Sequence, residues 1–185
     1  MAAIDSQMLP LGTEAPDFEL ADPSGAVVRR DDFKGKNGLL VMFICNHCPY
    51  VKHVRDELAR IGRDYQAKGI GIVAINSNDY EQYPEDSPAA MNDEIAAAGY
   101  TFPYLVDETQ EVARAYGAVC TPDTFLFDGD FKLAYRGQLD DTRPNQGRAA
   151  NGVDIRAALE AVLGDEAPSE DQRASTGCSI KWRSN

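Results

Sequence analysis

The chain has 185 residues, 43% of them hydrophobic and 26% charged, which is typical of a single globular domain. A formal net charge of -12 would repel phosphate backbones and anionic membrane surfaces, so neither nucleic acid nor membrane is an expected partner. No apolar run reaches the roughly 20 residues of a membrane span, and residues 1–7 lack the basic and apolar parts of a signal peptide. We therefore expect a cytoplasmic protein. Because the four cysteines are too sparse for a disulfide scaffold, a Cys-x-x-Cys pair predicts catalysis or metal binding.

The first predicted elements are a short β-hairpin, a buried strand, an amphipathic helix and a second buried strand. Residues 18–20 and 27–29 form the hairpin around a turn at 22–25. Residues 38–44 are an apolar run without polar alternation, as expected for a strand covered on both faces. A helix with one apolar stripe follows, and residues 70–75 are again apolar. This strand-helix-strand unit predicts a right-handed crossover and a parallel pair at the centre of a sheet.

The rest of the chain predicts further helices and strands around this centre. In order, they are a helix from Pro88 to Gly99 capped by Ser87, a strand at 102–106, a short helix at 108–116, a hairpin of 124–127 with 132–136, and a last helix at 152–163. We assign residues 1–163 to one domain and residues 164–185 to a C-terminal tail. Ile180 and Trp182 suggest that this tail docks near its end.

Two acidic segments raise the question of metal binding. The loop from Asp79 to Asp86 and the pair Asp140-Asp141 carry several carboxylates, but neither has the regular ligand alternation of a calcium loop. We therefore expect both to be solvated loops. Residues 140–145 follow a predicted strand and are expected to line the substrate cleft.

The tetrapeptide Cys45-Asn46-His47-Cys48 lies between the first buried strand and the helix. Two cysteines in the first turn of a helix can close a small disulfide, and the unpaired N–H groups and the positive dipole end favour a thiolate there. We predict a thiol-disulfide oxidoreductase in which Cys45, nearer the helix start, is the nucleophile and Cys48 resolves the mixed disulfide. A structural pair of small buried residues is the plainer alternative. Pro49 suits the first helical turn and has a structural role.

A resemblance to a known family rests on several segments. The order of elements, the Cys-x-x-Cys and residues 119–127 (VCTPDTFLF) together resemble the thioredoxin superfamily. Residues 11–18 (LGTEAPDF) resemble the start of its alkyl-hydroperoxide-reductase and thiol-specific-antioxidant branch. Residues 45–51 (CNHCPYV) with 177–182 (GCSIKW) resemble a bacterial subgroup of thioredoxin family proteins. The resemblance spans residues 10–163 and implies an α/β thioredoxin-like fold, with a central mixed β-sheet flanked by helices, an N-terminal β-hairpin and an inserted helix.

The resemblance also implies how the site is arranged. The peptide bond between Thr121 and Pro122 is expected to be cis and to lie against the Cys-x-x-Cys, which leaves the backbone of Thr121 free to pair with an extended substrate. Asn46 and His47 are expected to bind substrate or to tune the site. His47 would favour the Cys45 thiolate and a potential above that of thioredoxin. A solvated loop residue is the alternative for His47.

The other cysteines and the second histidine carry weaker signals. Cys120, close to Pro122, is expected at the rim of the site, either as a small buried hydrophobe or as an accessory thiol. Cys178 either docks without a redox role or exchanges thiols with the main site. His53 falls off the apolar stripe of its helix and is expected to face solvent.

Several other functions remain open. Ile44 and Leu39 stand where thioredoxin itself has a tryptophan and a buried acid, which argues against a plain thioredoxin-like reductase. A peroxiredoxin-like thiol peroxidase is one alternative, but residues 41–44 lack the threonine hydroxyl that precedes a peroxidatic cysteine. A copper or zinc binding module using Cys45, Cys48 and a histidine is another, but no second ligand pair follows. A redox-inert interaction domain is the third.

For the redox function, we expect no cofactor and no bound metal. The expected partners are a disulfide-containing protein or small molecule, and a reductant such as thioredoxin reductase or glutathione.

Overall fold

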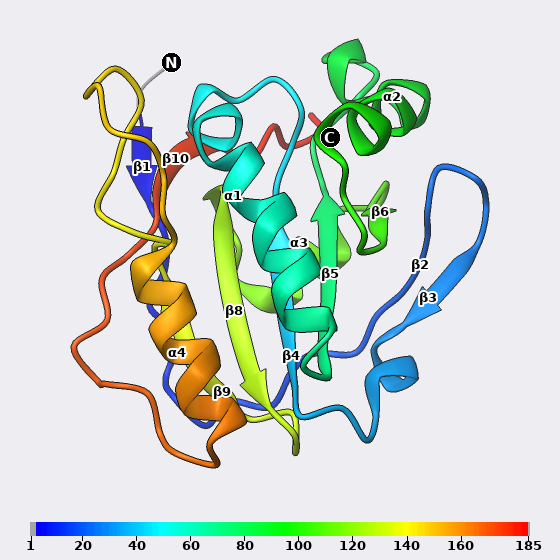
Figure 1. Ribbon diagram of the computed structural model, residues 1–185. Coiled ribbons are helices and arrows are strands. Elements are labelled where there is room, and N and C mark those ends of the chain that lie inside the picture. The colour runs from blue at the N-terminus through cyan, green and yellow to red at the C-terminus, as the bar shows by residue number, and fades with distance from the viewer. Residues whose placement is uncertain (1–2, 185) are drawn as a thin grey trace.

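The computed structural model describes residues 3–184, which form a mixed seven-stranded sheet between two layers of helices (Figure 1). The strands are β1 (Ala3–Asp5), β2 (Glu19–Ala21), β3 (Val27–Arg29), β4 (Gly38–Phe43), β5 (Ile70–Asn76), β6 (Tyr104–Val106), β7 (Cys120–Thr121), β8 (Asp123–Asp128), β9 (Leu133–Gly137) and β10 (Thr176–Ser179). The α-helices are α1 (Pro49–Gln66), α2 (Pro88–Ala98), α3 (Glu111–Tyr116) and α4 (Val153–Leu163), and the short 3-10 helices are η1 (Arg30–Phe33) and η2 (Pro84–Asp86). The predicted thioredoxin-like α/β fold class is confirmed.

The centre of the large sheet is the predicted strand-helix-strand unit. The strand order is β3-β2-β6-β5-β4-β8-β9, with β4 parallel to β5 and antiparallel to β8. Every residue of β4 and β5 is buried, which explains their unbroken apolar sequence. A second, three-stranded sheet has the order β1-β10-β7 and joins the two ends of the chain.

The two faces of the sheet carry separate hydrophobic cores. Because side chains alternate along a strand, Leu40 and Met42 of β4 join the core under α1 and α4, whereas Leu39, Val41 and Phe43 join the core on the side of α3. In Figure 1, α1 and α4 cross in front of the sheet and α3 lies behind it. The strand that leads into the Cys-x-x-Cys is therefore held on both faces.

The predicted boundaries hold best where the chain carries a local cap. Ser87 Oγ accepts the N–H of Ala90 at 3.3 Å to start α2, and Gly99 ends it with a φ of 71°. The predicted helix at 108–116 begins only at Glu111. Its first turn is replaced by a reverse turn at Asp107, whose carboxylate accepts N–H groups from the helix.

The expectation that the loop from Asp79 to Asp86 is solvated is wrong at both of its ends. Asn76, Asn78, Asp79 and Asp86 are all buried, because their polar groups bond to one another and to the tail. Asn78 Nδ2 donates to Asp86 Oδ2 at 2.8 Å, and the N–H of Asp79 donates to the carbonyl oxygen of Lys181 at 2.9 Å. These bonds replace the water contacts that a polar loop otherwise needs.

The C-terminal tail returns across the end of the sheet where α1 begins (Figure 1). β10 lies between β1 and β7, and the N–H of Ile180 donates to the carbonyl oxygen of Val119 at 2.9 Å. Trp182 packs under the guanidinium of Arg114, with 4.4 Å from the ring centroid to the guanidinium carbon. The tail is thus integrated into the fold at the edge of the cysteine site.

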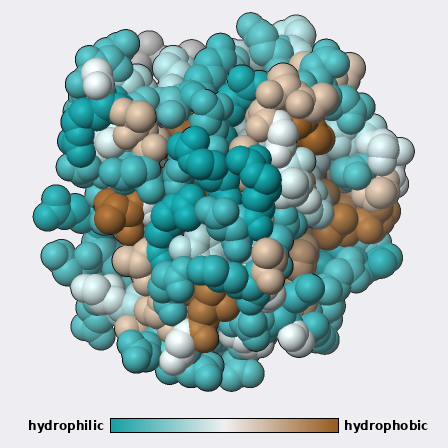
Figure 2. Space-filling model, in the orientation of Figure 1, coloured by the Kyte–Doolittle hydropathy of each residue, from teal (hydrophilic) through white to brown (hydrophobic). Residues whose placement is uncertain are grey.

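The surface in Figure 2 is predominantly hydrophilic, and its apolar residues appear as scattered spots. The large hydrophobic residues that are exposed come from separate segments: Ile4, Leu11, Val27 and Val153. Singly exposed apolar residues are ordinary on a globular protein. None of the α-helices within residues 3–184 has the length and apolar character needed to span a bilayer.

Asp123, the first residue of β8, is a buried carboxylate in an unfavourable setting. It is 1% exposed, and neither of its carboxylate oxygens makes a hydrogen bond of ordinary geometry within residues 3–184. Burial raises the pKa of Asp123 well above its ordinary value. The folded protein therefore favours the protonated form.

We expect the pH dependence of stability to change in Asp123→Asn. Because the pKa is raised in the folded state, the wild-type protein loses stability as the pH rises from the ordinary carboxyl pKa through the raised one. The amide cannot ionise, so the variant should lose less stability between pH 4 and pH 8. Urea unfolding across that range measures the difference. If the free energy of unfolding varies with pH in the same way for the two proteins, the prediction is contradicted.

Candidate active site

The Cys-x-x-Cys turn connects β4 to α1. The N–H of Ile44 donates to the carbonyl oxygen of Ile75 at 3.0 Å, which holds the chain in line with the sheet up to Cys45. Cys48 is the N-cap of α1, and Pro49 is its first residue, where the missing N–H costs no helical bond. Both cysteines are buried, with exposed fractions of 2% for Cys45 and 0% for Cys48.

Thr121 contacts both sulfur atoms. Its Oγ1 lies 3.3 Å from Cys45 Sγ, and its carbonyl oxygen lies 3.3 Å from Cys48 Sγ. The bond from Thr121 to Pro122 is cis, as the resemblance implied. The fold thus brings a residue 76 positions away in the sequence against the two cysteines.

The two sulfurs share one ionisation. The thiol of Cys45 donates to Cys48 and lowers the pKa of Cys48 to about 4; burial opposes this shift, and the thiol of Cys178 and a helical N–H support it. Conversely, the hydrogen bond to Cys48, burial and the charge of Asp86 raise the pKa of Cys45 well above its ordinary value. The N–H of Val51, in the first turn of α1, is the helical donor to the Cys48 sulfur.

The contacts of Thr121 favour the alternative proton position. The Thr121 hydroxyl can donate to a thiolate on Cys45, and this hydrogen bond lowers the pKa of Cys45. The carbonyl oxygen of Thr121 can accept a proton from Cys48. Together these contacts stabilise the state in which the shared proton has moved from Cys45 to Cys48, leaving Cys45 as the thiolate.

We expect Thr121→Val to slow attack by Cys45 on a disulfide about tenfold or more. The substitution keeps the side-chain shape and the carbonyl oxygen but removes the hydroxyl, and a hydrogen bond to a charged group contributes about 1.5–3 kcal/mol. Stopped-flow reaction with an aromatic disulfide at pH 7 measures the rate. Thr124→Val is the matched control, since the Thr124 hydroxyl bonds to the carbonyl oxygen of Gly137. Equal rates in the two variants would refute this role for Thr121.

His47 is held by a buried carboxylate. His47 Nδ1 lies 2.6 Å from Asp86 Oδ2, and its ring stacks on Tyr83 with 5.5 Å between ring centroids. The hydrogen bond to Asp86 raises the pKa of His47, although burial opposes this shift. The histidine is thus a positioned imidazole rather than the solvated loop residue considered above.

Asp86 organises the turn between the cysteines. Its Oδ1 accepts the N–H of Asn46 at 2.7 Å, in addition to the bonds from His47 and Asn78. Burial opposes the charge of Asp86, but these hydrogen bonds outweigh it and lower the pKa. Asn46 Nδ2 also donates to the carbonyl oxygen of Glu85 at 2.9 Å. Asn46 and Asp86 therefore tie the Cys-x-x-Cys turn to η2.

We expect Asp86→Asn to lower the pKa of His47 and also that of Cys45. The first follows from loss of the bond that stabilises the imidazolium, and the second from loss of a negative charge near the sulfur. Nuclear magnetic resonance titration of the His47 ring and the pH profile of Cys45 alkylation measure the two shifts. His53 provides the internal control ring. A His47 titration that matches the wild type would contradict the assigned contact.

One group of potential metal ligands includes these residues. Ligand atoms of Cys45, His47 and Asp86 all lie within 4.8 Å of one another. However, His47 and Asp86 already bond to each other, and Asp86 accepts further hydrogen bonds from Asn46 and Asn78. A metal ion here would have to replace bonds that are already satisfied.

The two further cysteines lie on opposite sides of the same strand pair. Cys178 in β10 belongs to the hydrophobic cluster that contains Cys45 and Cys48, and hydrogen bonding connects it to Cys48. Cys120 Sγ points instead to the carbonyl oxygen of Pro122 at 3.9 Å, and burial raises its pKa. All four cysteines are free thiols in this structure.

The backbone edge of Thr121 is not free, contrary to expectation. Cys178 of β10 pairs with Thr121, and Ser179 pairs with Cys120, in an antiparallel register. The tail therefore occupies the position that was expected for an extended substrate. No sequence pattern predicts this pairing, because β10 and β7 are short and lie far apart along the chain.

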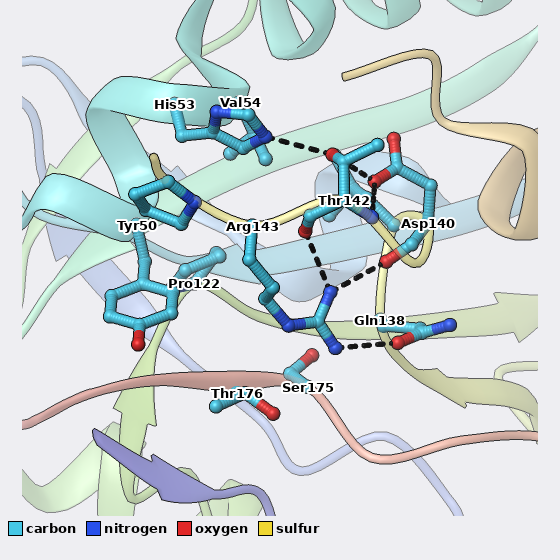
Figure 3. Close-up of a pocket in the computed structure, with 12 residues that line it drawn as sticks. Tyr50, His53, Val54, Pro122, Gln138, Asp140, Thr142, Arg143, Ser175 and Thr176 are labelled. Carbon is cyan, nitrogen blue, oxygen red and sulfur yellow. Dashed lines mark hydrogen bonds between the residues drawn. The ribbon is translucent and has the colours of Figure 1, made fainter. Parts of the chain in front are cut away.

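A small pocket lies beside Pro122 (Figure 3). Asp140 and residues 142–144 contribute to its wall. Asp140 is buried rather than solvated, because it accepts N–H groups from Asn151 and Gly152. His53 also contributes, with Nε2 2.8 Å from Thr142 Oγ1, so the prediction that it faces solvent is wrong. The cavity volume of about 20 Å³ has room for a single water molecule.

Comparison with known proteins places this site in a family. Residues 11–136 match the AhpC/TSA family. The chain belongs to the AhpC/TSA family. It is 33% identical over 126 residues to the thiol-disulfide oxidoreductase ResA of Geobacillus thermodenitrificans, covering 66% of each chain. It is 26% identical over 127 residues to the ResA of Bacillus thuringiensis, covering 69% of each.

Solved structures of other proteins resemble it over most or all of its length. A conserved protein of Geobacillus kaustophilus, described as uncharacterized, has a TM-score of 0.97 at 56% identity, covering 100% of this chain and 98% of that one. A hypothetical protein of Sinorhizobium meliloti has a TM-score of 0.96 at 46% identity, covering 98% and 99%. A putative thiol:disulfide interchange protein of Chlorobium tepidum, at 24% identity and a TM-score of 0.67, shares the fold and covers 85% and 100%.

Sequence reasoning missed Asp86 and the hydroxyl of Thr121 as parts of the site. Asp86 lies 39 positions from His47, within a loop whose other acidic residues include exposed ones. The only local signal is its place just before the Ser87-Pro88 helix start. A buried carboxylate cannot be distinguished from a solvated one by residue type alone.

Proposed function

We propose that this AhpC/TSA-family protein is a thiol-disulfide oxidoreductase that uses Cys45 and Cys48 to exchange with a disulfide of a protein or small molecule. The observation that carries the proposal is the contact of Thr121 with both sulfurs, at 3.3 Å each. The family relationship to proteins named thiol-disulfide oxidoreductase supports it. Two adjacent thiols with opposite pKa shifts suit sequential attack and resolution.

The reaction consists of two exchange steps. The Cys45 thiolate attacks one sulfur of the substrate disulfide, forms a mixed disulfide and releases the other substrate sulfur as a thiolate. Cys48, which loses its proton in this second step, then attacks the sulfur of Cys45 and releases the second substrate thiolate. The substrate is reduced to two thiols, and the Cys45–Cys48 pair is oxidised to a disulfide. A dithiol or glutathione reductant returns the pair to its starting state.

We expect Cys45→Ser and Cys48→Ser each to slow severely the turnover of a disulfide substrate with glutathione. Cys45→Ser removes the attacking sulfur, whereas Cys48→Ser should leave the enzyme trapped as a mixed disulfide at Cys45. Cys120→Ser is the matched control, because Cys120 is equally buried but bonds to the carbonyl oxygen of Pro122. Turnover at the wild-type rate in Cys45→Ser would refute the proposal.

Two alternatives have a structural observation in their favour. Thr121 supplies near Cys45 the hydroxyl that residues 41–44 lack, which favours a thiol peroxidase. The ligand group of Cys45, His47 and Asp86 favours a metal site. Stoichiometric peroxide consumption that depends on Cys45 would establish the first, and one equivalent of zinc or copper retained by the purified protein would establish the second.

A further inference from the structure

The C-terminal tail carries a third cysteine into the site. In β10, Cys178 pairs with Thr121, the residue whose carbonyl oxygen lies 3.3 Å from Cys48 Sγ. On its other side, Cys178 pairs with Ala3 of β1. The cysteine is therefore fixed by backbone pairing on both sides, at the position of the strand that faces the start of α1.

The tail is built for this close approach. A Cβ atom on Gly177 would lie 1.9 Å from the carbonyl oxygen of Thr121, so only glycine allows β10 to reach β7. Similarly, a Cβ on Gly137 would lie 1.9 Å from the carbonyl oxygen of Arg173, where the tail crosses β9. Two glycines at two crossings fix the path of the tail over the site.

The three sulfurs form a series with Cys48 in the middle. Thr121 contacts the sulfurs of Cys45 and Cys48 and pairs with Cys178, and interactions of Cys48 with both of the other cysteines lower its pKa. All three side chains belong to one buried cluster. Cys120 pairs with Ser179, the next residue of β10, and its sulfur points to the carbonyl oxygen of Pro122 instead. Cys48 thus has two thiols from which to choose a disulfide partner.

We propose that Cys178 is a third exchange thiol. In the oxidised protein, it replaces Cys45 as the disulfide partner of Cys48. This inference rests on the proposed function, because that reaction supplies the Cys45–Cys48 disulfide. The sulfur of Cys178 attacks that of Cys48, the Cys45–Cys48 bond breaks, and a Cys48–Cys178 bond forms. The proton of Cys178 passes to the departing Cys45 sulfur. The protein as a whole is neither oxidised nor reduced in this step.

The exchange has two consequences for the site. Cys45 becomes a free thiol again while the protein still holds one disulfide, so it can attack a second substrate. In addition, the Cys48–Cys178 bond fastens β10 to the start of α1. The tail then covers Thr121 through a covalent bond as well as through backbone pairing.

The sequence makes the bridge measurable by peptide mapping. Trypsin places Cys45 and Cys48 together in residues 37–52, Cys120 in residues 115–132 and Cys178 in residues 174–181. A bond from Cys48 to Cys178 therefore joins two peptides, whereas a Cys45–Cys48 bond lies within one. Alkylation of the remaining thiols with N-ethylmaleimide before digestion prevents further exchange.

The decisive experiment oxidises Cys45→Ser with oxidised glutathione. One thiol of Cys48 or Cys178 forms a mixed disulfide with glutathione, and the other displaces glutathione to complete the bridge. We expect peptides 37–52 and 174–181 to be joined. The bridge should persist in the double variant that carries Cys45→Ser and Cys120→Ser. It should disappear in the double variant that carries Cys45→Ser and Cys178→Ser. A protein that carries glutathione on Cys48 or Cys178 without the bridge would overturn the proposal.

The wild-type protein provides a second test that does not depend on a substituted nucleophile. After oxidation by one equivalent of disulfide, we expect a fraction of molecules with the inter-peptide bridge and an alkylated Cys45. Gly177→Ala, which pushes β10 away from Thr121, should reduce that fraction severalfold. Circular dichroism checks that the variant is folded. If the oxidised wild type contains the Cys45–Cys48 bond but no bridge to Cys178, and its turnover is normal, the role of Cys178 is refuted and the proposed function is left intact. Absence of any Cys45–Cys48 bond would instead refute the proposed function.

Discussion

The contact between Thr121 and the two sulfurs is the constraint on which the site depends. A threonine at the end of β7 offers a donor to one sulfur and an acceptor to the other, at 3.3 Å in each case. In a site with almost no solvent exposure, such fixed dipoles decide where the single negative charge lies, because water cannot compensate. The chemistry of the pair therefore depends on a proton that moves between Cys45 and Cys48.

Two segments outside the Cys-x-x-Cys complete its surroundings. Asp86 at the end of η2 holds the turn through the N–H of Asn46 and the ring of His47, and it places a buried negative charge near Cys45. The tail closes the other side through the pairing of Cys178 with Thr121. The charge of Asp86 disfavours a thiolate on Cys45, whereas the Thr121 hydroxyl favours it, so the two groups act in opposite directions on the Cys45 pKa.

The family relationship and the site geometry carry different information. Membership of the AhpC/TSA family accounts for residues 11–136, which include the central sheet, α1 and the cis-proline turn. The tail lies beyond that match, yet it supplies the strand next to Thr121 and a third thiol next to Cys48. The segment outside the family match thus adds a strand and a thiol to the site that lies within the family match.

Local sequence patterns were sufficient to predict the central unit of the fold and the place of the cysteines in it. An apolar run, an amphipathic stripe and local caps such as Ser87 are signals between near neighbours, so β4, α1, β5 and α2 could be predicted. Only the tertiary structure decided which side chains surround the sulfurs. Thr121 reaches Cys45 across 76 positions, and Asp86 reaches His47 across 39. Such long-range contacts leave no periodic pattern, because burial and pairing arise only when distant segments pack together.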